Sequence, residues 1–150
     1  MNETLQTLSA TPAKLETILA ALEGLGKLDT PRATGKWTPR QILAHFSDAE
    51  VIQRVRVMAM LTEDKPIMTA FNADAWAAAG AYTKRDARSS LRTFCAIRTT
   101  NNELLASLTQ SQLERRGTHP TRGEFSIEEW LDFVARHDLS HLAQLEASLS

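Results

Sequence analysis

Two histidines near the C-terminus, His137 and His141, are spaced as a pair of metal ligands. They lie four residues apart in a segment whose apolar residues recur at helical spacing. Residues i and i+4 share one face of a helix, so the two imidazoles point the same way. Neutral imidazole nitrogens are common ligands for zinc, nickel, copper and iron. Two ligands alone make a weak site, so a third must come from elsewhere in the chain.

The third candidate is His45, on another expected helix. Thr38 is its expected N-cap, and Gln41 completes a capping box. The helix should continue to about Leu61, with an inner stripe of Ile42, His45, Phe46, Ala49, Ile52 and Val55. A lone inward histidine is usually a core residue with a hydrogen-bond partner, and that alternative stays open here. Three inward imidazoles that share no partner would be costly to bury, which favours a metal site.

The composition describes an ordinary globular domain. The chain has 150 residues, of which 43% are hydrophobic and 23% charged, enough for a single core. A net charge of −1 gives no electrostatic case for nucleic acid, and no apolar run is long enough to span a membrane. The N-terminus lacks the features of a signal peptide, and a single cysteine, Cys95, excludes an internal disulfide. These features lead us to expect a cytoplasmic protein.

Two more long helices are expected before the histidine pair. The first should begin at Pro12, directly after Thr11, and end at Gly24, because proline suits the first helical position. The next is expected to begin with Thr83 as its cap, together with Asp86. The segment 62–83 between the second and third long helices is broken by proline and glycine, with room for a short helix at Ala73–Ala79. Such a long connection indicates a crossover along the bundle.

The last helix has a clear beginning. Residues 117–125 contain proline and glycine and are expected to form a loop. Ser126 and Glu129 then make a capping box at the start of the helix that carries the histidine pair. Four amphipathic helices predict an all-α fold, a four-helix bundle made by one domain over residues 1–150.

The positions of the histidines favour one bundle topology. At about 1.5 Å per residue, His45 lies roughly 10 Å from the start of its helix, and His141 roughly 12 Å from the end of the last helix. These heights match best if the two helices are antiparallel. The long crossover would in turn make the second and third helices parallel. Both observations favour the order up-down-down-up.

Two stretches carry a family resemblance. Residues Trp37–His45 with Asp48, and residues His137–Gln144, resemble the DinB/YfiT-like superfamily of proposed metal-dependent enzymes, and the likeness covers nearly the whole chain. The resemblance implies an up-down-down-up bundle, often a homodimer, and a divalent metal, commonly nickel or zinc. Some members are transferases or isomerases that use a low-molecular-weight thiol such as bacillithiol or mycothiol. The family's three histidine ligands fall on His45, His137 and His141.

Two aspartates lie beside these histidines in the sequence. Asp48 follows His45 by one helical turn and could orient a ligand or accept a proton, but a surface salt bridge explains it equally well. Asp138 stands where H-E-x-x-H metalloproteases have glutamate. Aspartate is shorter, and a helical bundle offers no strand for a peptide substrate, which argues against a protease.

Other residues have simpler interpretations. His119 is expected to be exposed, away from the histidine pair, and Cys95 to be a small core residue. Arg98 and Asn101 lie close to an apolar stripe, where interhelical hydrogen bonds explain them better than a pocket does. Three aromatic residues are expected either to crowd the metal end or to pack at the loops: Trp37, Trp76 and Tyr82.

Three functions fit these observations. The first is a metal-dependent enzyme, a transferase or a hydrolase, that activates a thiol or water to act on a small molecule. The second is a non-catalytic metal-binding protein or a stress-related, ligand-binding helical dimer. The third is a dimerisation domain with three ordinary core histidines. Metal content separates the third from the others, and metal-dependent turnover separates the first from the second.

Overall fold

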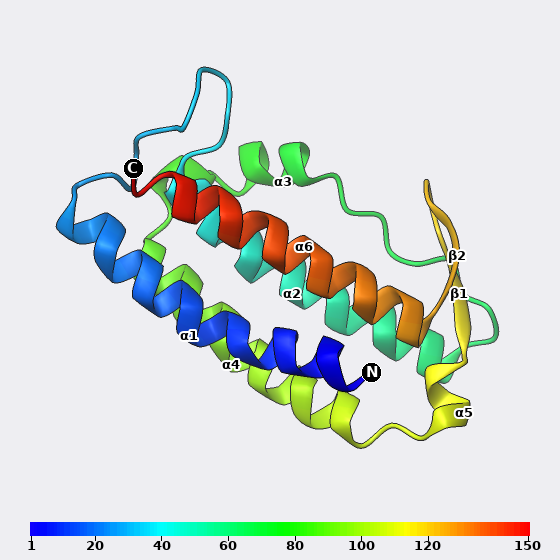
Figure 1. The fold of residues 1–150 in the computed structure, drawn as a ribbon. Coiled ribbons are helices and arrows are strands. Elements are labelled where there is room, and N and C mark those ends of the chain that lie inside the picture. Colours follow the sequence, from blue (N-terminus) through cyan, green and yellow to red (C-terminus); the bar gives the residue numbers. More distant parts are fainter.

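Capping residues set the starts of two long helices. A computed structural model describes residues 1–150 and contains the helix α2 (Pro39–Thr62) and the helix α6 (Ile127–Ala147) (Figure 1). At α2 the Thr38 hydroxyl accepts from the Gln41 N–H at 3.3 Å, and Gln41 Oε1 accepts from the Thr38 N–H at 2.9 Å. Ser126 and Glu129 form the same capping box at α6. Both starts agree with the sequence prediction.

The first helix, α1 (Asn2–Gly24), begins earlier than predicted. Pro12 lies inside the helix, so the prediction that it is the first helical residue was wrong. Proline has no N–H, which leaves the carbonyl oxygen of Leu8 without its usual helical donor. Arg98 Nη1 supplies a substitute donor at 3.1 Å, which satisfies this carbonyl and lets the helix continue.

The helix α4 (Ala87–Ala106) begins later than predicted. Its N-cap is Asp86, whose Oδ1 accepts from the Ser89 N–H at 2.7 Å. Thr83 lies in a separate 3₁₀ turn, η1 (Tyr82–Lys84), and does not cap the helix as predicted. The carboxylate of Asp86 alone therefore caps this helix.

The four long helices follow the predicted up-down-down-up order (Figure 1). Parallel α1 and α6 are joined by hydrogen bonds that advance together along both helices, Thr4 with Asp132 and Thr11 with Asp138. The helices α2 and α4 are likewise parallel, whereas α2 and α6 run in opposite directions (Figure 1). None of the helices combines the length and the hydrophobicity that a membrane-spanning segment needs.

The connections add small elements at the two ends of the bundle. The crossover from α2 to α4 contains the helix α3 (Ala73–Ala79), as predicted. A short helix, α5 (Gln110–Leu113), leads into the strands β1 (Arg116–His119) and β2 (Gly123–Ser126), which pair antiparallel. The prediction of a loop at 117–125 was therefore wrong.

The hairpin depends on a contact that is remote in the sequence. The Met68 N–H donates to the Thr118 carbonyl at 2.8 Å, and the Thr118 N–H donates to the Pro66 carbonyl at 2.9 Å. The crossover thus pairs with β1 and supports a hairpin whose strands are only four residues each. A pattern in so short a segment gives little local signal for a strand.

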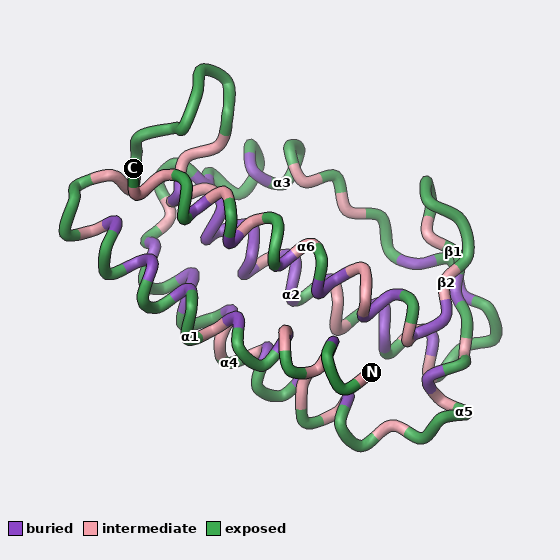
Figure 2. Tube along the Cα trace, in the orientation of Figure 1, coloured by how far each residue is buried: buried purple, intermediate pink, exposed green.

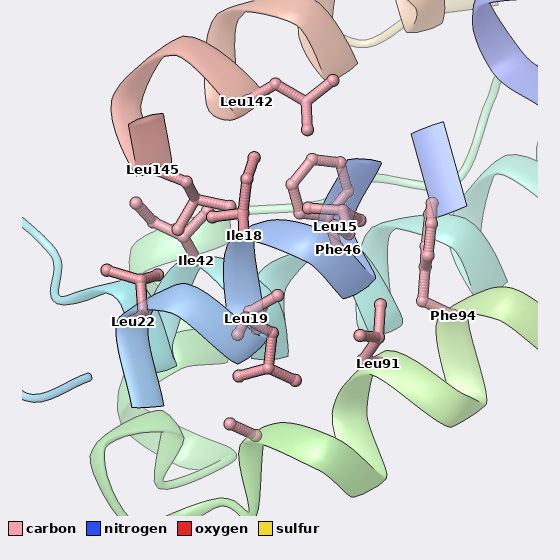
Figure 3. Close-up of a cluster of buried hydrophobic side chains, with 12 residues drawn as sticks. Leu15, Ile18, Leu19, Leu22, Ile42, Phe46, Leu91, Phe94, Leu142 and Leu145 are labelled. Atoms are coloured by element: carbon pink, nitrogen blue, oxygen red, sulfur yellow. The ribbon is translucent and has the colours of Figure 1, made fainter. Parts of the chain in front are cut away.

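A buried polar layer divides the core into two apolar clusters. Buried residues lie along the inner faces of the helices, while the loop before α2 is exposed (Figure 2). One cluster lies near the end of α1 and includes Leu15, Ile18, Leu22, Phe46 and Leu145 (Figure 3). The other surrounds Trp130, near the hairpin. Every long helix places at least one buried polar side chain between the clusters: Thr11, Glu50, Arg98, Asn101 and Asp138.

Candidate metal centre

The structure brings the three candidate histidines together. His45 from α2 meets His137 and His141 from α6, with one ligand nitrogen of each ring within 4.8 Å of the others. The Nε2 atoms of His45 and His137 are 2.9 Å apart. Because His137 and His141 lie one turn apart on the same face of α6, a single residue of α2 can face both of them.

Burial keeps at least two of these rings uncharged. His45 is only 4% exposed, and burial lowers its pKa to about 3, helped by the neighbouring rings of His137 and His141. Burial, followed by the proximity of His137, also lowers the pKa of His141 to about 4. The neutral imidazole is the form that binds a metal, so neither ring needs to lose a proton at neutral pH.

The hydrogen bonds of the rings show which nitrogens are free. His141 Nδ1 donates to Gln144 Oε1 at 3.0 Å, because an amide oxygen only accepts; this leaves the Nε2 lone pair of His141 free. His45 Nδ1 is enclosed and has no partner. A histidine kept only for core packing would bond both nitrogens, but the one nitrogen contact of His45 is to another ring of the cluster. The set therefore fits three imidazole ligands that face a shared ion.

Aromatic side chains shield the cluster. Trp37, from the loop before α2, has its ring centroid 5.2 Å from that of His45. Phe71, from the crossover, stacks on His45 at 5.7 Å with an interplanar angle of 11°. Trp37 therefore crowds the three histidines, as expected, and the crossover covers them through Phe71. Trp76 packs on Phe71 at 5.0 Å. Tyr82 is fully buried at the edge of this group.

One side of the cluster opens into a cavity of about 570 Å³. This volume is in the range of sites for small molecules. All three histidines line the cavity, which continues along the groove between α2 and α6 towards the hairpin. A metal held by three histidines would keep coordination positions open on this side, as catalytic rather than structural sites do.

Comparisons with known proteins agree with this geometry. The model of the DinB superfamily matches residues 7–145. The chain belongs to the DinB superfamily. Its curated relatives include YfiT of Bacillus subtilis, 29% identical over 142 residues (94% of this chain and 79% of YfiT), and BH0277 of Halalkalibacterium halodurans, 28% identical over 145 residues (97% and 84%). Both are named as candidate metal-dependent hydrolases.

A solved structure matches equally well. YfiT from Bacillus subtilis superposes with a TM-score of 0.91 at 28% identity, covering 98% of this chain and 84% of YfiT. It is described as a candidate metal-dependent hydrolase with an unusual four-helix bundle topology. This DinB-superfamily chain therefore shares the bundle of YfiT, and its own three histidines lie close enough together to hold a metal ion.

Asp48, the candidate proton acceptor or ligand-orienting residue, bonds to Tyr82 and Arg85 in this DinB fold. Its Oδ2 accepts from the Tyr82 hydroxyl at 2.7 Å, and Arg85 Nη1 lies 2.8 Å from both carboxylate oxygens. Asp48 is not among the residues that line the cavity. This is the salt-bridge alternative, and it also fixes η1 against α2.

Asp138 turns away from the cavity towards Arg98. It lies 2.6 Å from Arg98 Nη1, and its Oδ1 is 3.9 Å from His137 Nδ1. Burial alone would raise the pKa of Asp138, but His137 and Arg98 outweigh it and hold that pKa below its usual value. The resulting carboxylate stands behind His137, where it can orient the ring.

Arg98 and Asn101 form the interhelical bonds that the sequence favoured. Arg98 pairs with Glu50 at 2.7 Å, and Asn101 Nδ2 donates to Glu50 Oε1 at 2.6 Å. Cys95 is partly buried at the edge of the core, and burial raises the pKa of its thiol. A protonated thiol in this position is consistent with packing rather than nucleophilic chemistry.

Sequence reasoning missed part of the cavity wall. His119 was expected to be exposed, but the hairpin stacks its ring on that of Trp130, with centroids 5.6 Å apart. It also lines the cavity, beyond the three clustered histidines. Arg56 and Gln53 were not singled out. Both follow His45 on α2 at helical spacing, a signal that could have placed them on the same face.

Proposed function

We propose that this protein is a divalent-metal-dependent enzyme that acts on a small molecule, with hydrolysis as its first candidate reaction. The supporting observation is the convergence of His45, His137 and His141 on one wall of an open cavity. The names of its relatives as candidate metal-dependent hydrolases also support it. Zinc or nickel is the proposed ion, since both accept imidazole nitrogen.

Each residue around the centre has a defined part in this proposal. A divalent ion there would supply a Lewis acid, which makes a bound water or thiol more acidic. The three histidines would hold it, Gln144 fixes the orientation of His141, and the rings of Trp37 and Phe71 limit access of water. Substrate would enter along the α2–α6 groove, because the cavity lies there.

A thiol-dependent transferase is the second candidate. Asp48 and Asp138 are occupied by Arg85 and Arg98, so neither offers a free carboxylate base at the cavity end of the histidines. A thiol loses its proton to solvent far more easily than water does, and a metal-bound thiol is deprotonated outright. A low-molecular-weight thiol is therefore a proposed co-substrate.

Turnover on two panels would test these candidates. Chelated protein is reloaded with zinc or nickel and assayed on ester and amide substrates, and then on electrophiles with small thiols. Hydrolysis that requires both the ion and all three histidines supports the first candidate, and thiol consumption with the same requirements supports the second. Metal binding without turnover on either panel would instead favour a non-catalytic metal-binding protein.

We also propose that the protein is a homodimer in the cytoplasm. Val51, Val55 and Met58 form an exposed apolar stripe on α2, at the spacing of one helix face, so the expectation that Val55 lies on the inner stripe was wrong. The third long helix, α4, has no large exposed hydrophobic side chain. Light scattering at micromolar concentration should give twice the chain mass, and a monomer mass would contradict this.

A further inference from the structure

Arg56 is a buried cation without a carboxylate partner. It is 4% exposed, and no ion pair includes it. Its Nε and Nη2 donate to the Thr69 carbonyl at 3.0 and 2.7 Å, and its guanidinium lies 5.0 Å from the Trp130 ring. Nη1 has no hydrogen-bond partner in the protein, and it is not completely enclosed. An arginine with spare donors and no counterion in a buried position is costly to keep.

The position of Arg56 links it to the candidate metal centre. Arg56 lines the same cavity as His45, on the same face of α2. The two residues are separated by three helical turns, or about 16 Å between backbone positions. Arg56 therefore lies at the end of the groove near the hairpin, opposite the end that holds the three histidines.

A second cation from another element lies at that end. Arg122, in the turn of the hairpin, lines the cavity with its guanidinium 5.1 Å from the ring of Phe133. Burial, and after it the charge of Arg122, lowers the pKa of Arg56 to about 10, so the two cations lie close enough to repel each other. Asp74 on α3 is the one carboxylate that lines the cavity, against Arg32, Lys36, Arg56 and Arg122.

We infer that Arg56 and Arg122 form a subsite for an oxyanion, a carboxylate or a phosphate, at one end of an elongated substrate. The inference rests on the proposed function, because the other end of that substrate would reach the metal at the three histidines. The planar guanidinium of Arg56 offers paired donors that match either oxyanion. A bound anion would supply the missing counterion of Arg56 and relieve its repulsion with Arg122.

Thiols with charged or neutral tails test this directly. Zinc-loaded protein is titrated by calorimetry with ω-mercapto acids from mercaptohexanoate to mercaptoundecanoate, and with the mercapto alcohols of the same lengths. The thiol binds the metal, so the tail reports on the far end of the groove. We expect the acid of matching length to bind at least about tenfold tighter than its alcohol, as a charge-assisted hydrogen bond allows. A phosphate-tailed thiol tells whether the subsite prefers phosphate to carboxylate.

Variants locate the effect. Arg56→Gln and Arg122→Gln should each remove most of the advantage of the acid. Arg54→Gln should keep it, because Arg54 lies on the same helix but bonds to Asn101 on α4. Equal affinity of acid and alcohol at every length, or an unchanged advantage in both cavity variants, would overturn the subsite. Arg122 is exposed, so its variant decides the matter if Arg56→Gln does not fold.

An arm without metal separates this inference from the proposed function. Inorganic phosphate should raise the melting temperature of chelated wild-type protein, and should do so less for Arg56→Gln or Arg122→Gln. If no thiol binds the zinc-treated protein while this shift persists, the metal centre fails and the subsite stands. If thiols bind but no anion effect appears in either arm, the subsite is wrong and the metal centre stands.

Discussion

A single guanidinium, that of Arg98, connects all four long helices. From α4 it bonds Glu50 on α2, Asp138 on α6 and the carbonyl of Leu8 on α1. Burial alone would lower the pKa of Arg98, but Glu50 and Asp138 outweigh it, and this pKa is raised above its usual value. The charge is thus retained in the polar layer that separates the two apolar clusters, directly behind the proposed metal ligand His137.

We predict that Arg98→Met destabilises the protein strongly. Removal of the cation leaves Glu50 and Asp138 buried without compensation, at a cost of about 3–5 kcal/mol. The matched control is Arg88→Met, on the same helix, whose partner Glu23 is at the surface; it should cost about 1 kcal/mol or less. Urea unfolding measures both free energies. Equal losses would show that the buried network is not what holds this layer.

The buried histidines predict that the metal-free protein loses stability in acid. The pKa of His45 is about 3 and that of His141 about 4 in the folded chain, against 6.5 as the ordinary value. Between about pH 6.5 and pH 4 the unfolded chain binds protons that the folded chain does not, so the unfolding free energy falls as the pH is lowered.

Urea unfolding of chelated protein across this pH range would measure the effect. His45→Phe should flatten the dependence, since phenylalanine suits the same aromatic surroundings and does not titrate. His119→Phe should change the dependence less, because His119 is more exposed. If the unfolding free energy of His45→Phe varied with pH as it does in the wild type, buried His45 would not be a cause of the loss of stability in acid.

At the scale of elements, the sequence predicted helices with local signals and missed those set by distant contacts. The capping boxes at Thr38 and Ser126 placed α2 and α6 correctly, and with them the three histidines. The interior position of Pro12 could not be predicted, because its compensating donor, Arg98, comes from a helix far along the chain. The hairpin likewise depends on pairing with the crossover at Met68.

The candidate site shows the same division. Histidine spacing and family resemblance pointed to the cluster of three histidines. The residues around this cluster are placed by tertiary contacts. From the sequence alone, Asp48 could have faced either the histidines or a salt-bridge partner. Tyr82 and Arg85, at η1, show that it faces the salt-bridge partner. The proposed role of Arg56 depends on its having no ion-pair partner, and a sequence alone does not show which side chains meet in space.

We predict that Gly117→Ala weakens the attachment of the hairpin to α2. A Cβ at this position would lie 2.8 Å from Met60 Cγ and 3.2 Å from the Pro66 carbonyl oxygen. Met60 is fully buried, so its side chain has little free space to move into, and overpacking should cost about 1–3 kcal/mol. Gly24→Ala is the control, because a Cβ there meets nothing within 4 Å, and it should leave stability unchanged or raise it by up to about 1 kcal/mol. Thermal unfolding of both variants would decide.

The whole molecule combines an apolar bundle with a site on one of its grooves. Two clusters of 12 and 11 buried residues hold the helices, so the fold does not depend on an ion as a zinc finger does. The antiparallel pair α2 and α6 carries both the histidines and the cavity, and the crossover and hairpin cover its two ends.

We predict that chelation lowers the melting temperature and leaves the helices intact. An ion bound only by the native state adds stability by mass action, and its removal takes that stability away. Circular dichroism should show the same helix content before and after chelation, and zinc should restore the melting temperature of wild-type protein but not of His45→Ala. A random coil after chelation would show that the site is structural, contrary to a catalytic centre.

The most direct measurement is the metal content of purified protein and the affinity of each histidine variant. Protein expressed without a histidine tag should carry one divalent ion per chain. Replacing His45, His137 or His141 with alanine should lower the affinity greatly, because two imidazoles bind weakly, while His119→Ala should leave it nearly unchanged. Failure to bind zinc or nickel at micromolar concentration, or wild-type affinity in His45→Ala, would contradict the three-histidine metal centre.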